Sequence, residues 1–239
     1  MVQMLAAASV AAPELKAIVE DCSSFSEALI VFKWIQLISR TGFNTDEPSI
    51  TSKFCYLCLI RLGDLSRWRE TLLVIKNRDW GPAIVYYDLA ANINLGDGVA
   101  CHKISVIASL NGNLLDSVYW SYRSLATTKP PMFSEDKLRG HLQSATDRFN
   151  SECEGTYALS KSTESSDELQ NNLILSCLRL HAAYFLPLGP LDRRSIEDAF
   201  LHLLKVSLNR QGFEDVVGKL LIIGLAAEYT AQNRAKGKS

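Results

Sequence analysis

Residues 58–70 read Cys-Leu-Ile-Arg-Leu-Gly-Asp-Leu-Ser-Arg-Trp-Arg-Glu, and the other informative motifs of the chain follow this stretch. Further apolar patterns with helical spacing lie at 80–90, 103–108 and 122–126. Small residues recur where neighbouring backbones must approach, and aromatic residues recur where the space between helices must be filled. The pattern predicts an array of helical hairpins.

The tetratricopeptide pattern can be tested by counting, because its second helix requires small, aromatic, small and proline-like residues at fixed offsets. Ala83, Tyr87, Ala90 and Leu95 occupy offsets 0, 4, 7 and 12, with Leu95 in place of the usual proline. The same offsets recur 35 residues later, at Val118, Tyr122, Leu125 and Pro130. We therefore predict an all-α fold with two irregular repeats, and an ordinary helical bundle is the alternative.

Four motifs in this region resemble the Ever Shorter Telomeres family, which joins the telomerase regulatory subunit with the SMG adaptors of nonsense-mediated mRNA decay. They read Leu-Ile-Arg-Leu-Gly-Asp-Leu-Ser-Arg-Trp-Arg, Trp-x-x-Ala-x-x-Tyr-Tyr-x-x-Ala, Val-Ile-Ala-x-x-x-Gly-Asn-x-Leu and Tyr-Arg-Ser-Leu-Ala-x-x-x-Pro. The specific match covers about residues 55–131, and the chain looks closest to fungal members. The resemblance implies an N-terminal domain similar to 14-3-3 proteins.

The chain is long enough, at 239 residues with 47% hydrophobic residues, to bury a sizeable core. We predict a 14-3-3-like tetratricopeptide domain over 1–150 and a C-terminal helical hairpin region over 169–239. Residues 151–168 are rich in Ser, Glu and Thr, which predicts a flexible linker. Near the start of the chain we expect a helix over 26–40, and the organising helix is expected to begin near Ser52. The buried apolar face of the organising helix is expected to contain Phe54, Leu57, Cys58, Ile60, Leu62, Leu65 and Trp68.

The charges on the organising helix indicate a binding site. Asp64 lies three residues from both Arg61 and Arg67, so its carboxylate can reach either arginine along one side of the helix. An arginine held by a carboxylate is preorganised to bind phosphate with two parallel hydrogen bonds. The alternative is that Arg67 has only the structural role of pairing with Asp64.

The family resemblance implies which residues form this site. In the family, a helix with Gly-Asp-x-x-Arg-Tyr supplies an arginine and an aromatic side chain to a phosphoserine pocket. Gly63, Asp64, Arg67 and Trp68 match this motif, with Trp in place of Tyr. Arg67 is therefore the leading candidate, accompanied by Trp68, Asp64 and Arg61.

Two further basic residues are candidates for the same site. Lys103 lies in Cys101-His-Lys-Ile-Ser105, where family members usually read His-Asn-Gln-Leu-Ala. Because the chain departs from the family here, the sequence does not identify the second basic residue of the pocket. Arg123 belongs to the Tyr-Arg-Ser-Leu-Ala motif of the family.

Other chemistries receive little support from the sequence. The pair Cys55-x-x-Cys58 has no second Cys or His pair at zinc spacing, so we interpret both as core thiols of a reduced intracellular protein and predict no metal. No protease, nucleotide-binding or kinase signature occurs, so we predict neither catalysis nor a cofactor. No segment has the roughly 18 apolar residues of a membrane span.

We therefore predict a non-catalytic adaptor that binds a phosphorylated protein partner in nonsense-mediated decay or telomerase regulation, in the nucleus, the cytoplasm or both. Two alternatives remain open. One is a regulatory subunit that binds telomeric DNA or RNA, although a net charge of −1 provides no global field for nucleic acid. The other is a degenerate paralogue that keeps only the scaffold.

Overall fold

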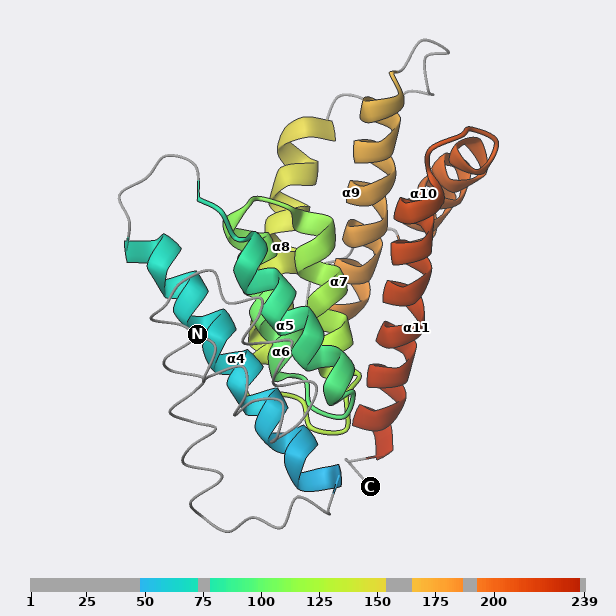
Figure 1. Ribbon diagram of the computed structural model, residues 1–239. Coiled ribbons are helices and arrows are strands. Elements are labelled where there is room, and N and C mark those ends of the chain that lie inside the picture. Colours follow the sequence, from blue (N-terminus) through green and yellow to red (C-terminus); the bar gives the residue numbers. More distant parts are fainter. Residues whose placement is uncertain (1–47, 73–77, 154–164, 187–192, 237–239) are drawn as a thin grey trace, which may run out of the picture. The chain divides into compact units, whose positions relative to one another are not determined.

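The computed structural model describes residues 48–72, 78–153, 165–186 and 193–236, and these residues form an all-α fold, as predicted. Within these ranges the helices are α4 (Pro48–Leu72), α5 (Gly81–Ile93), α6 (Val99–Leu110), α7 (Leu114–Leu125), α8 (Ser134–Cys153), α9 (Ser166–Phe185), α10 (Arg193–Leu208) and α11 (Glu214–Lys236). Helix α4 pairs with α5, α6 with α7, and α8 with α9 as antiparallel hairpins, and α10 packs against α9 (Figure 1). The predicted helix over 26–40 lies outside the described residues.

The chain divides into two compact units, Met1–Leu95 and Gly96–Ser239. The predicted linker falls mainly on residues 154–164, which lie outside the described ranges, so the predicted domain boundaries stay a prediction. Helix α9 begins beside it with a capping box, in which Ser165 accepts a hydrogen bond from the Glu168 backbone and Glu168 accepts one from the Ser165 backbone.

In the first unit, α4 and α5 pack as a hairpin through small and aromatic residues. Ala83, Tyr87 and Ala90 are all buried, which confirms the inward face predicted from the repeat offsets. Gly63 lies directly against Tyr87, since a Cβ atom at this position would come within 2.7 Å of Tyr87 Cδ1. The backbone of α4 can approach the tyrosine ring because this residue has no side chain.

Two expectations for α4 were wrong. The helix begins at Pro48 rather than near Ser52, and a proline is tolerated there because the first turn of a helix leaves its N–H groups unpaired. Leu57 and Trp68 were expected on the buried apolar face, but they are 54% and 57% exposed. The buried stripe of α4 runs through residues spaced by three and four, and these two side chains lie outside it.

In the second unit, α6 and α7 form a hairpin whose turn contains Gly112 at φ 70, a conformation that glycine adopts without steric cost. Helices α7, α8, α9 and α11 then enclose one core, in which Val118, Leu138, Leu173 and Ile223 are fully buried. Helix α11 packs against both α7 and α9.

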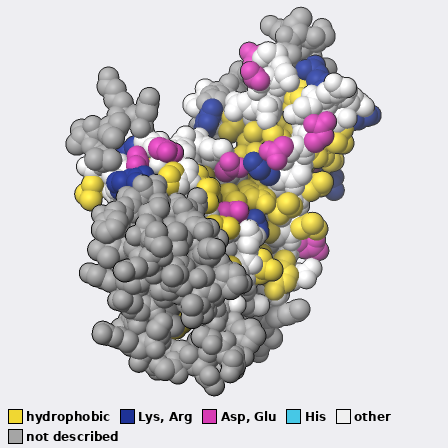
Figure 2. All heavy atoms as spheres, in the orientation of Figure 1, with side chains coloured by type: hydrophobic (Ala, Val, Ile, Leu, Met, Phe, Trp, Pro, Cys, Tyr) yellow, Lys and Arg dark blue, Asp and Glu magenta, His cyan; other side chains and the backbone are white. Residues whose placement is uncertain are grey.

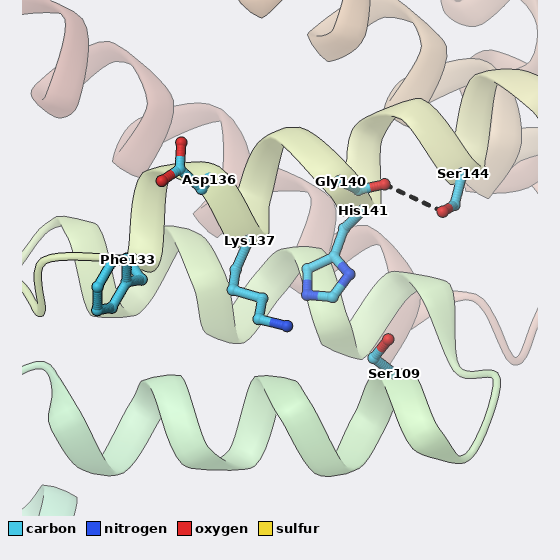
Figure 3. Close-up of a pocket in the computed structure, with 7 residues that line it drawn as sticks. All are labelled: Ser109, Phe133, Asp136, Lys137, Gly140, His141 and Ser144. Atoms are coloured by element: carbon cyan, nitrogen blue, oxygen red, sulfur yellow. Dashed lines mark hydrogen bonds between the residues drawn. The ribbon is translucent and has the colours of Figure 1, made fainter.

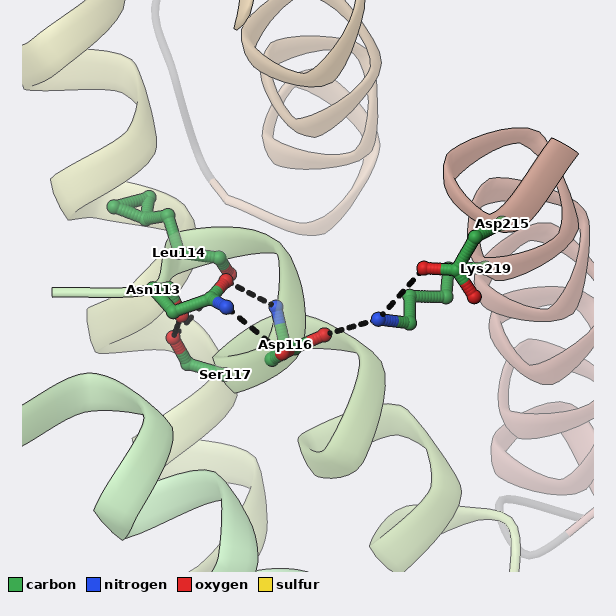
Figure 4. A network of polar contacts seen from close by, with 6 residues as sticks. All are labelled: Asn113, Leu114, Asp116, Ser117, Asp215 and Lys219. Carbon is green, nitrogen blue, oxygen red and sulfur yellow. Dashed lines mark hydrogen bonds and ion pairs between the residues drawn. The ribbon is translucent and has the colours of Figure 1, made fainter. Parts of the chain in front are cut away.

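A polar network joins α7 to α11 (Figure 4). Asn113 caps α7, accepting a hydrogen bond from the Asp116 backbone at 3.0 Å and donating one to the Asp116 carboxylate at 2.8 Å. The other carboxylate oxygen of Asp116 binds Lys219 Nζ at 2.9 Å, and Lys219 also reaches Asp215 at 3.2 Å. This network fixes the position of α11 on α7.

The surface of the second unit mixes charges of both signs with hydrophobic side chains on the face shown in Figure 2. Leu221, Leu225 and Tyr229 of α11 are among the exposed hydrophobic residues. None of the described helices is long and apolar enough to cross a membrane.

Candidate partner-binding site on helix α4

The side chains of Arg61, Asp64 and Arg67 lie along one side of α4, as their spacing predicts. Arg61 Nη1 lies 4.0 Å from one oxygen of the Asp64 carboxylate, and Arg67 Nη2 lies 3.8 Å from the other. The two arginines differ in exposure, since the Arg61 side chain is 69% exposed and the Arg67 side chain is 19% exposed. Arg67 is therefore the arginine held within the fold, and Arg61 extends into solvent.

Helix α5 contributes Tyr87, which the sequence interpretation placed in the core without assigning it a polar role. Its hydroxyl donates a hydrogen bond of 2.8 Å to Asp64 Oδ1, the same oxygen that pairs with Arg67. Burial raises the pKa of Tyr87, and its hydrogen bond to Asp64 raises this pKa further, so the hydroxyl remains protonated. Tyr87 thus fixes the carboxylate that orients Arg67.

The guanidinium of Arg67 has unused hydrogen-bonding capacity. Its Nε is buried and has no hydrogen-bond partner among the described residues. A buried donor without a partner is unfavourable, and such groups in native proteins call for an explanation. The Arg67 side chain is 19% exposed, so a phosphate could form charge-assisted hydrogen bonds with the exposed part of the guanidinium and not with the buried Nε.

The neighbours of Arg67 on α4 have different surroundings. Trp68 presents an exposed indole next to it in sequence. Arg69 Nε binds the buried Glu70 carboxylate at 3.1 Å, and the other oxygen of Glu70 accepts the Asp79 backbone N–H at 3.0 Å. Arg69 and Glu70 therefore anchor the chain that leads to α5, and Arg69 is committed to this role.

The remaining two predicted site residues belong to the second unit. Lys103 lies on α6 and Arg123 lies on α7. The Arg123 guanidinium stacks on two aromatic rings, 4.7 Å from the Trp120 centroid and 5.7 Å from the Tyr119 centroid. The structure therefore brings Arg61, Asp64 and Arg67 together on α4, whereas the membership of Lys103 and Arg123 in that site stays a prediction.

The four cysteines whose side chains the structure describes, Cys55, Cys58, Cys101 and Cys177, are buried core residues. Cys55 and Cys58 are buried, reduced thiols one helical turn apart, and burial raises the pKa of Cys58 to about 11. Within the described ranges, no cluster of His, Cys, Asp and Glu could hold a metal ion.

Comparison with known proteins identifies the family. A family model described as "Est1 DNA/RNA binding domain" matches residues 83–239, which is more than half of the chain. The chain belongs to this family. Membership in the Est1 family confirms the resemblance seen in the sequence motifs.

Three curated relatives match parts of the chain. The nonsense-mediated mRNA decay factor SMG7 of Danio rerio is 26% identical over 175 residues, or 70% of this chain. The telomere elongation protein est1 of Schizosaccharomyces pombe is 33% identical over 76 residues, or 32% of this chain. The nonsense-mediated mRNA decay factor SMG7 of Arabidopsis thaliana is 30% identical over 104 residues, or 43% of this chain.

The matched regions cover 13%, 15% and 10% of these three Est1-family relatives, respectively. No solved structure gives a significant match to the chain.

Proposed function

We propose that the chain is a non-catalytic adaptor that binds a phosphorylated segment of a protein partner at Arg67. The process would be nonsense-mediated mRNA decay or telomere maintenance, because the relatives are named as decay factors and a telomere elongation protein. The corresponding location is the nucleus, the cytoplasm or both.

The observation that carries the proposal is the state of Arg67. Its guanidinium is held from one side by Asp64, which Tyr87 fixes in turn, and its Nε has no partner among the described residues. A preorganised arginine loses little side-chain entropy when it binds phosphate, and the planar guanidinium matches two phosphate oxygens. A neutral serine hydroxyl offers no comparable charge, so binding should depend on phosphorylation.

The test is fluorescence polarisation with phosphoserine peptides from a library, each paired with its unphosphorylated form. Wild-type protein is compared with Arg67→Gln and with Lys53→Gln, which removes the same charge from an exposed position on the same helix. We expect phosphate-dependent binding that Arg67→Gln reduces at least tenfold and Lys53→Gln leaves unchanged. Absence of phosphate-dependent binding by the wild-type protein would refute the proposal.

Nucleic-acid binding is a second candidate, and the description of the family model favours it. In the second unit, Arg123 stacks on Tyr119 and Trp120, which places a cation beside aromatic rings. Proteins that bind single-stranded nucleic acids combine cations and aromatic rings in this way. Binding of this kind weakens steeply with salt. A chain that binds neither phosphopeptides nor nucleic acid would be the degenerate scaffold.

A further inference from the structure

A groove of about 540 Å³ lies in the second unit, beside helix α8. Its volume is within the range of roughly 300–1,000 Å³ that ligand pockets occupy. The lining residues are Ser109, Phe133, Asp136, Lys137, Gly140, His141 and Ser144. None of them belongs to the candidate site on α4.

The basic and acidic side chains of the groove point in different directions (Figure 3). Lys137 and His141 point from α8 toward the helix that carries Ser109, whereas the carboxylate of Asp136 points the other way. The Ser144 hydroxyl donates a hydrogen bond of 3.0 Å to the Gly140 carbonyl, which leaves its oxygen able to accept one. The side of the groove between α8 and Ser109 therefore has a cation and the Ser109 hydroxyl, and the acidic group points away from it.

The two histidines near the groove are neutral at pH 7. Burial lowers the pKa of His141 to about 4, and the nearby charges of Lys137 and His102 lower this pKa further. Burial also lowers the pKa of His102, with contributions from Lys103 and Lys137. The positive charge at this junction of α6 and α8 consequently comes from the two lysines.

An exposed aromatic ring stands next to this charge. Phe133 is 62% exposed, and its backbone carbonyl accepts the Lys137 N–H at 3.1 Å, which places the two residues one helical turn apart. A solvent-exposed phenyl ring one turn from a lysine offers a flat apolar surface and a cation to the same ligand.

Gly140 leaves open space in the groove. A Cβ atom built at this position meets nothing within 4 Å, so packing within the protein does not require a glycine there. Glycine inside a helix is destabilising relative to alanine. The groove therefore has room for a ligand over Gly140.

These features select the class of ligand. An apolar side chain of a partner would strip water from Lys137 and the serine hydroxyls without replacing their hydrogen bonds. A bare phosphate would engage Lys137 but would make no use of Phe133. A nucleotide satisfies both, because its base has a face that stacks on a phenyl ring and its phosphate pairs with a lysine.

We propose that the groove binds one nucleotide unit of a single-stranded nucleic acid, with the base stacked on Phe133 and the phosphate held by Lys137. The sugar and base edge then lie over Gly140 and near the hydroxyls of Ser109 and Ser144. This inference deepens the nucleic-acid candidate above, and it is independent of the phosphopeptide site at Arg67.

The test is fluorescence polarisation of the full chain with fluorescein-labelled oligouridylate and oligothymidylate, at several salt concentrations. We expect Phe133→Ala to weaken binding about tenfold or more, in line with the loss of a stacked base. Lys137→Gln should lower the slope of log affinity against log salt by about 0.7, the value for one phosphate contact to a single strand. Lys205→Gln, which removes the same charge from an exposed position on α10, should leave the slope unchanged.

Gly140→Leu provides a variant in which loss of binding cannot be attributed to unfolding. Its Cβ meets no atom, and leucine favours helix over glycine, so the protein should unfold at the same or a higher urea concentration. We expect this variant to lose binding because its side chain fills the groove. Preference for RNA would implicate the ribose 2′-hydroxyl, and equal binding of both strands would show that base and phosphate suffice.

Two results would overturn the inference. If the wild-type chain binds neither oligonucleotide, the nucleic-acid candidate fails with it, while the phosphopeptide assay still decides the role of Arg67. If the chain binds but Phe133→Ala and Gly140→Leu keep full affinity, nucleic acid binds elsewhere on the protein.

Discussion

Replacing Tyr87 with phenylalanine tests whether the tyrosine hydroxyl holds the Asp64–Arg67 pair in place. The substitution removes one hydroxyl that donates to a carboxylate at 2.8 Å and preserves the ring, which is fully buried. A hydrogen bond to a charged group contributes about 1.5–3 kcal/mol to the free energy of unfolding. The Asp64 side chain retains 14% exposure, so water can partly replace the lost donor. We therefore expect a loss of about 1.5–2 kcal/mol.

The measurement is urea unfolding followed by far-UV circular dichroism, with the melting temperature as a second readout. For a chain of this length, 1 kcal/mol lowers the melting temperature by about 2–4 °C, so Tyr87→Phe should lower it by about 3–8 °C. Tyr229→Phe is the matched control, because its ring is 45% exposed on α11. If Tyr87→Phe and Tyr229→Phe unfold at the same urea concentration, the hydroxyl of Tyr87 does not stabilise the Asp64 carboxylate. Tyr87 then does not hold the Asp64–Arg67 pair in place.

Three further predictions concern packing, pH and the network on α11. Gly63→Ala should destabilise the protein by about 1–2 kcal/mol in urea unfolding, because the new methyl group overlaps the buried Tyr87 ring. This strain outweighs the gain in helix propensity. Unchanged stability would show that α4 and α5 can separate freely. Burial lowers the pKa of His141 and His181 to about 4 in the folded chain, below the usual 6.5, so stability is fully present above about pH 6.5 and falls as the pH drops toward 4. When the pH falls from 7 to 5, each histidine should lower the free energy of unfolding by up to about 2 kcal/mol. Equal urea midpoints at these two pH values would contradict the burial of both rings. Lys219→Met should remove about 0.5–1 kcal/mol at low salt and less at 1 M salt, since the ammonium is partly exposed; a loss that is independent of salt would indicate a packing effect instead.

Local patterns predicted much of the first unit correctly. The offsets of Ala83, Tyr87 and Ala90 identified the inward face of α5, since residues three and four apart share one side of a helix. The same rule placed Asp64 between two arginines. These contacts depend only on spacing within one helix, so the sequence alone specifies them.

Contacts between distant residues escaped prediction for a physical reason. The hydrogen bond from Tyr87 to Asp64 joins positions 23 residues apart, and its existence depends on how α5 lies on α4. The groove beside α8 likewise combines Ser109 with residues of another helix, none of which stands out in the sequence. The spacing of hydrophobic residues also gave no reason to expect Trp68 in solvent, because α4 is apolar on more than one side.

The most direct test of the central claim is a thermodynamic cycle that crosses Arg67→Gln with removal of the phosphate from the tightest-binding phosphoserine peptide. Four dissociation constants give the coupling free energy between the guanidinium and the phosphate. A hydrogen bond between charged groups predicts a coupling of about 1.5 kcal/mol or more, equivalent to at least a tenfold change in affinity. A coupling near zero would mean that Arg67 does not bind the phosphate, and that its pairing with Asp64 is purely structural.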